Sequence, residues 1–241
     1  MNVSAIAATL ESFVARHQTT FAKLGSRQSQ ILELAAIIGV SQHYAATGFD
    51  VQVVNPGTRT TFVVKSATRG HPADYSCISC SRGDDCVELH ANLLVQGAHD
   101  DGVYCVDVGI TVPGSVPDQK GKETWVCLPN SELLSFAEVK KLVVYPMLLA
   151  QFLGIVHEIR PEFLSPPTPR EFGPGRHLPP TLISLGHFSG NSRHIVDSFV
   201  RRGFGFLITP NFDMHLSWCR KDSTRSPFFG LPDDWDPDAA V

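Results

Sequence analysis

The stretch that most constrains how this chain folds is residues 133–142 (LLSFAEVKKL), an apolar segment that carries charges. Its composition predicts a buried β-strand. Side chains alternate between the two faces of a strand, so Glu138 and Lys140 point one way and Val139 points the other. Burial of an unpaired carboxylate or ammonium group is costly. The two charges are therefore either an ion pair or part of a functional site.

A second acidic residue lies upstream in a similar context. Asp107 is the one charge in the apolar segment 104–110, which also predicts a strand. Two carboxylates and a lysine on neighbouring strand ends are the groups that Mg²⁺-dependent cleavage of a phosphodiester needs. The acids bind the hard cation through oxygen, and the lysine polarises the attacking water or steadies charge on the phosphate.

The composition indicates a globular protein and argues against two function classes. Of 241 residues, 43% are hydrophobic and 18% are charged, which suits one large domain or one domain with an appendage. The net charge of −4 argues against a generally basic nucleic-acid coat protein, but not against an enzyme with a local basic groove. No apolar run approaches ~18 residues and no leader pattern opens the chain, so we expect no membrane partner and a cytoplasmic location.

Apolar periodicity predicts the organisation of the chain. We expect an N-terminal helix in residues 1–26, a core domain over 27–210, and a tail over 211–241 that packs on the core or on a partner. The core opens with a helix over 27–46 that is apolar on most sides. Glu33 lies in this helix, either as a solvent-facing glutamate or as a further acid of the metal site.

Turn signals divide the rest of the core into strands and helices. Segments 49–54 and 60–65 predict a hairpin; Lys65 ends its second strand, but no acid lies two residues before it, so it is a poorer catalytic candidate than Lys140. Segment 87–95 and the Asp107 strand predict another hairpin. The remaining predicted elements are strand 123–128, helix 147–159, strand 181–185, helix 193–202 and strand 204–208. Residues 164–180 are either a mobile loop that touches phosphate or a plain connector.

A cluster of metal-ligand residue types lies between the two hairpins. Without a secretion signal, the six cysteines are expected to be reduced or metal-bound. Four ligand types occur at short spacings that suit a structural Zn²⁺ ion, namely Cys77, Cys80, Cys86 and His90. The alternative is that residues 75–80 form a strand whose thiols are incidental.

The order of these elements resembles the PD-(D/E)XK nuclease superfamily, whose members have a restriction-endonuclease-like fold. Asp107 matches the first acid of the motif, Glu138 the second acid and Lys140 the lysine. The match covers roughly residues 27–210 in layout, although Val106 replaces the proline of the motif. In a rival register Glu88 and His90 take the role of the first acid and Asp107 that of the second. The lysine position would then be Gly109, so the first register is preferred.

The resemblance implies an α/β core with a central mixed sheet flanked by helices. It also implies a Mg²⁺- or Mn²⁺-dependent endonuclease that acts on DNA rather than RNA, in restriction, repair or antiphage defence. Asp107, Glu138 and the carbonyl group of Val139 would bind the metal. The alternative function is a non-catalytic module on the same fold that binds nucleic acid, another protein or a second copy of the chain. The plainest alternative is an unrelated α/β protein with an ion pair within a strand.

Overall fold

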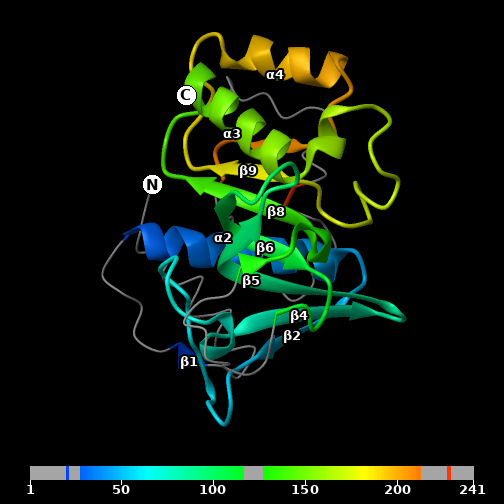
Figure 1. The fold of residues 1–241 in the computed structure, drawn as a ribbon. Helices are drawn as coiled ribbons and strands as arrows, with labels where there is room; N and C mark the ends of the chain where they lie inside the picture. Colours follow the sequence, from blue (N-terminus) through cyan, green and yellow to red (C-terminus); the bar gives the residue numbers. More distant parts are fainter. Residues whose placement is uncertain (1–19, 22–27, 117–126, 213–226, 229–241) are drawn as a thin grey trace.

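The structure is a computed structural model that describes residues 20–21, 28–116, 127–212 and 227–228. Its core is α/β, with a mixed eight-stranded sheet flanked by helices (Figure 1). The strands are β1 (Thr20–Phe21), β2 (Asp50–Val54), β3 (Thr61–Phe62), β4 (Cys77–Arg82), β5 (Asp85–Gln96), β6 (Val103–Thr111), β7 (Cys127–Leu128), β8 (Leu133–Lys140), β9 (Thr181–Ser184) and β10 (Leu207–Thr209). The helices are α2 (Gln28–Ala46), α3 (Pro146–Ile159) and α4 (Ser192–Arg201), with short 3₁₀ turns at Pro72–Asp74, Asn130–Glu132 and Pro161–Leu164.

The main sheet has an antiparallel part and a parallel part that meet at β8. Its order is β10-β9-β8-β6-β5-β4-β2, and β7 pairs with β5 outside this path. Strands β2, β4, β5, β6 and β8 are successively antiparallel, whereas β9 is parallel to β8 and β10 is parallel to β9. The crossovers from β8 to β9 and from β9 to β10 contain α3 and α4, as parallel strands require.

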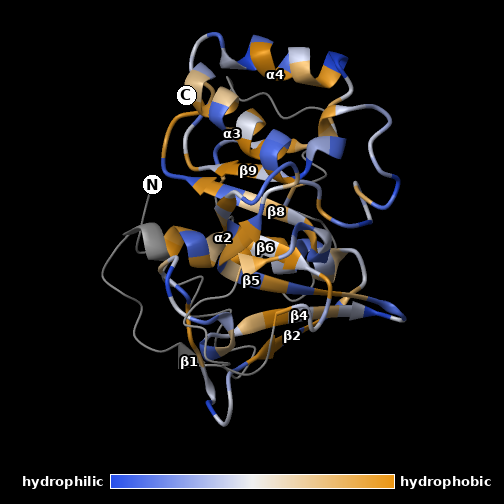
Figure 2. Cartoon of the chain, viewed as in Figure 1, coloured by the Kyte–Doolittle hydropathy of each residue, from blue (hydrophilic) through white to orange (hydrophobic). Residues whose placement is uncertain are grey.

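Helices α2 and α3 cover opposite faces of the sheet around β8. Ala137 and Val139 pack in the same apolar cluster as the buried face of α2. Phe136 packs in a second cluster with α3. Because neighbouring side chains of a strand point to opposite faces, the two helices lie on either side of β8. Apolar residues are concentrated along the central strands of the sheet (Figure 2).

Most of the predicted elements are present. Helix 27–46, helix 147–159 and the β5–β6 hairpin are confirmed, as is the parallel strand pair connected by a helix near residue 200. Of the predicted strand 123–128, residues 127–128 form β7, and the rest lies outside the described residues. None of the described helices is long and apolar enough to cross a membrane.

One prediction about strand pairing is wrong. The strand at 60–65 does not form a hairpin with β2; β2 pairs with β4, and β3 pairs in parallel with β1. Ser76, which precedes β4, bonds both the Asn55 side chain and the backbone of Val63, so Val63 pairs with Ser76 and not with a residue of β2. The predicted N-terminal helix lies largely outside the described residues, but Thr20–Phe21 is a strand. The predicted tail also lies mainly outside them.

Candidate active site

The site lies where β6 and β8 separate. The ladder between these strands ends at the pair Val108 and Ala137, whereas β8 continues to pair with β9 through Lys140. The backbone N–H of Val139 donates a hydrogen bond of 2.7 Å to the carboxylate of Asp107. The Asp107 side chain is thus fixed beside the last residues of β8.

Lys140 connects the two predicted acids. Its Nζ atom lies 2.8 Å from Glu138 Oε2 and 3.2 Å from Asp107 Oδ2. Glu138 and Lys140 therefore point the same way, as strand alternation predicts. The structure brings together Asp107, Glu138 and Lys140 although about thirty residues separate the first from the others in sequence.

The charges in this cluster are incompletely balanced. The Glu138 side chain is 5% exposed, and its Oε1 atom is buried with no hydrogen-bond partner in the described part of the chain. Burial, and next the charge of Asp107, raise the pKa of Glu138 to about 7, although the Lys140 ammonium group and a backbone hydrogen bond from Asp107 both lower it. Burial opposes the charge on Lys140, but Glu138 and Asp107 outweigh it and raise the pKa of Lys140. Lys140 is consequently a stable cation, and Glu138 is an acid that needs a proton or a further cation.

Glu33 lies close to this cluster. It is half-buried on α2, and its Oε2 atom accepts a hydrogen bond of 2.9 Å from Asn92 Nδ2. Burial raises the pKa of Glu33; the Asn92 hydrogen bond opposes the shift, and the charges of Asp107 and Lys140 also act on it. Of the two alternatives for Glu33, the structure therefore favours an acid near the site over a freely solvated one.

Asn92 is a residue of this region that the sequence did not single out. It is buried on β5 and has a left-handed backbone conformation with φ of +49°. Its carbonyl oxygen accepts a 2.5 Å hydrogen bond from Lys65 Nζ, which also binds the carbonyls of Ala67 and Thr68. Lys65 is thus occupied by backbone oxygens, in keeping with its lower rank as a catalytic candidate. Asparagine is one of the residues that adopt a left-handed backbone, but this preference does not indicate from sequence that Asn92 lies beside the acids.

The structure does not group the four residues of the predicted zinc site. Cys80 is fully buried in the core, and burial raises its thiol pKa to about 12. Cys77 lies an odd number of residues away on the same strand and so points to the opposite face. Cys86 and His90 are four residues apart on β5, which separates them by about 13 Å. Within the described ranges, no three His, Cys, Asp or Glu residues are grouped to bind a metal.

The rival register does not match the geometry. Glu88 and His90 bond each other, with Oε2 and Nε2 3.3 Å apart, and they lie opposite Thr111 and Gly109 in the β5–β6 ladder. They line a pocket of about 220 Å³ together with residues of the segments 54–57 and 72–77. The hydrogen bond from His90 lowers the pKa of Glu88, although burial opposes it. Lys140 pairs instead with Asp107 and Glu138, the two acids of the first register.

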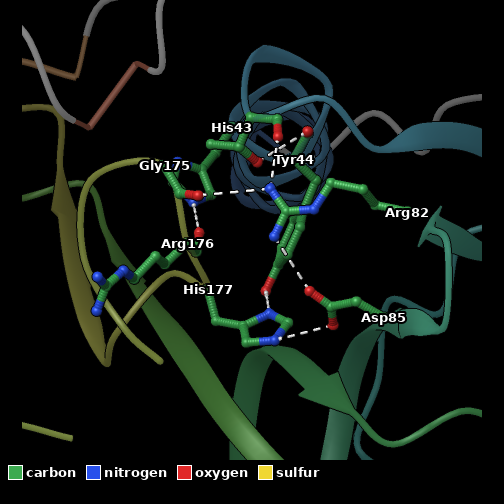
Figure 3. Close-up of polar contacts among 8 residues, drawn as sticks. His43, Tyr44, Arg82, Asp85, Gly175, Arg176 and His177 are labelled. Atoms are coloured by element: carbon green, nitrogen blue, oxygen red, sulfur yellow. Dashed lines mark hydrogen bonds and ion pairs between the residues drawn. The ribbon is translucent and has the colours of Figure 1, made fainter. Parts of the chain in front are cut away.

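The segment 164–180 is anchored, as the connector alternative requires. His177 lies between Tyr44 and Asp85, and Asp85 also binds Arg82 (Figure 3). We refer to Tyr44, Arg82, Asp85 and His177 as the clasp. It fixes the segment to the end of α2 and to the β4–β5 hairpin. His43 adds a 2.8 Å contact with the carbonyl of Arg176.

Comparison with protein-family models, with curated proteins and with solved structures gave no match. The class of protein therefore has to be inferred from the sheet and from the cluster of two acids and one lysine.

Proposed function

We propose that the chain is a metal-dependent nuclease with a restriction-endonuclease-like core, which hydrolyses phosphodiester bonds of DNA. The observation that carries the proposal is the convergence of Asp107, Glu138 and Lys140 where the antiparallel and parallel parts of the sheet meet. The layout supports it: α2 precedes the antiparallel strands β5, β6 and β8, and α3 leads to β9, which is parallel to β8.

The donor set fits a hard divalent cation such as Mg²⁺ or Mn²⁺. Glu138 Oε1 is a buried carboxylate oxygen without a partner in the described part of the chain, which is the kind of atom that a cation satisfies. Asp107 and Glu138 would bind the ion, and the resemblance adds the carbonyl of Val139. Two protein carboxylates suffice, since Mg²⁺ usually keeps several waters and binds substrate phosphate. When bound, the ion would act as a Lewis acid on the scissile phosphate.

The remaining roles follow from the electrostatics. The raised pKa of Lys140 keeps its side chain an ammonium group, which has three donors and no acceptor. Lys140 is therefore suited to orient a water molecule and to offset phosphate charge, and unsuited to take a proton. Glu33 adds negative charge near Asp107 and Lys140. Exposed basic residues such as Arg193 and Arg201 are candidates for sequence-independent contacts with the DNA backbone.

A non-catalytic binding module is the second candidate, and one observation favours it. Lys140 already bridges both carboxylates, an arrangement that a purely structural ion pair would also have. Such a module would bind nucleic acid or protein through other surfaces and would not need a cation at Glu138.

A nicking assay separates the two candidates. Supercoiled plasmid is incubated with the wild-type protein in Mg²⁺, in Mn²⁺ and in EDTA, and the same is done for Glu138→Gln and Lys140→Met. Glu88→Gln is the matched control, because it alters a half-buried acid on a neighbouring strand outside the cluster. We expect cation-dependent nicking by the wild type and the control, and none by the two site variants. Equal nicking by all four proteins, or none by the wild type, would reject the nuclease assignment.

A further inference from the structure

The hydrogen bonds around Asn92 connect the proposed site to α2. The ladder between β5 and β6 pairs Ala91 with Val108 and Leu93 with Val106, but it skips the position of Asn92, opposite Asp107. Leu89 and Ala91 pack in the α2 cluster, whereas Leu93 and Val95 pack in the α3 cluster, although all four are spaced by two residues. The left-handed backbone at Asn92 thus reorients β5 at the level of Asp107.

Two further contacts fix the Asn92 side chain. Its Nδ2 atom donates to the Lys65 carbonyl at 2.8 Å and to Glu33 Oε2 at 2.9 Å. Lys65 is 3% exposed and returns a bond from Nζ to the Asn92 carbonyl. Both amide protons of Asn92 are hydrogen-bonded, and a buried lysine holds its backbone carbonyl. The Asn92 side chain therefore has little freedom to rotate. Glu33 is consequently the acceptor of a rigid donor.

We propose that Asn92 is a positioning residue that holds the Glu33 carboxylate toward Asp107, and that Lys65 fixes Asn92 for this role. The inference rests on the proposed function, because it assigns Asn92 a role in cation binding. Glu33 then acts beside the direct ligands, through its negative charge and its acceptor oxygens. The Asn92 hydrogen bond favours the ionised form of Glu33, against the effect of burial.

The test is a double-mutant cycle between Asn92→Gly and Glu33→Gln, read out as Mn²⁺ affinity by electron paramagnetic resonance. Glycine accepts the left-handed backbone, so Asn92→Gly removes the amide without adding strain. Asn211→Gly is the matched control, since Asn211 has the same φ of +49° and is exposed. Thermal unfolding of each variant reports the fold. If Asn92→Gly does not fold, Asn92→Ser, whose side chain is too short to reach Glu33, replaces it in the cycle.

We expect Asn92→Gly to weaken Mn²⁺ binding by about 10–100-fold, the usual effect of losing a residue that supports a metal site from outside its ligands. Asn211→Gly should bind as the wild type does. In the Glu33→Gln background, Asn92→Gly should have no further effect, because Asn92 acts through the negative charge of Glu33, which that background already lacks. Additive losses, or wild-type affinity in Asn92→Gly, overturn the positioning role and leave the nuclease proposal intact. A wild-type protein that neither binds Mn²⁺ nor nicks DNA overturns both.

Discussion

Two polar clusters of this protein differ in how completely their atoms are paired. The clasp and the Asp107–Glu138–Lys140 cluster each join segments that are far apart in sequence. In the clasp, one oxygen of Asp85 binds His177 and the other binds Arg82, which also donates to the carbonyl of Thr47. In the other cluster, Glu138 keeps a buried oxygen without a partner in the described part of the chain, and its pKa is raised to about 7.

The difference in pairing indicates which of the two clusters is the functional site. A buried polar group without a partner lowers stability, so a fold that keeps one holds it for another purpose or satisfies it with a ligand. The clasp is at the end of α2, among surface segments, and its pairing explains its presence as a support (Figure 3). The Glu138 cluster lies within the sheet and is not explained by pairing alone.

The largest expected difference between the two clusters is in the effect of an Asp→Asn change on the rate of nicking. Asp107→Asn should lower Mg²⁺-dependent nicking by about 10³-fold or more, since transition-state stabilisation of several kcal/mol is lost with the bound cation. Asp85→Asn, the same change in the clasp, should leave the rate within a few-fold of the wild type. Rates of plasmid nicking at saturating Mg²⁺ decide this. A similar loss in both variants would place the site elsewhere or make the effect one of folding.

The pH dependence of stability sharpens the contrast in the metal-free protein. The pKa of Glu138 is about 7 in the folded state against 4.5 ordinarily, so between these values the folded state binds more protons. The free energy of unfolding should therefore fall as pH rises from about 5 to above 7, by on the order of 2 kcal/mol. Urea denaturation across this range measures it. Glu138→Gln should flatten the curve and be the more stable protein at pH 8; an unchanged curve would contradict the raised pKa.

Unlike changes in the Asp107–Glu138–Lys140 cluster, a change in the clasp should lower the free energy of unfolding and have little effect on the nicking rate. His177→Ala removes the contacts to Tyr44 and Asp85 and leaves the buried Tyr44 hydroxyl with only the backbone of Leu178 among these partners. We expect the free energy of unfolding to fall by about 1–3 kcal/mol. Nicking at 25 °C should change less than two-fold. If His177→Ala abolished nicking without lowering stability, the clasp would have to be part of the active site.

The smallest effect concerns the cysteines. Incubation with a strong zinc chelator should leave the melting temperature unchanged, because the four predicted ligands lie on different strand faces and at separated positions. Metal analysis of the purified protein under reducing conditions should find no stoichiometric zinc. Zinc at one equivalent, lost together with stability on chelation, would contradict the geometry around Cys80.

The sequence predicts the parts of this fold that depend on local periodicity. Alternation in 133–142 places Glu138 and Lys140 on one side, and the apolar pattern of α2 and α3 defines both helices. Pairing between distant segments is harder to predict from sequence. Nothing within residues 60–65 indicates that β3 pairs with β1 or that Val63 bonds Ser76. Asn92 is missed for the same reason, because its importance arises from β5, α2 and Lys65 meeting at one point. Alternation also indicates that Cys77 and Cys80 face apart, once 77–82 is taken as a strand.

The proposed nuclease requires that Asp107 and Glu138, the two carboxylates that Lys140 bridges, form a cation site. The most direct test is anomalous diffraction from crystals grown with Mn²⁺ at millimolar concentration. We expect a manganese peak within coordinating distance of both carboxylates, with Lys140 Nζ displaced from at least one of them. No peak at this position, with Lys140 still bonded to both acids, would contradict it and leave an ion pair that only stabilises the sheet.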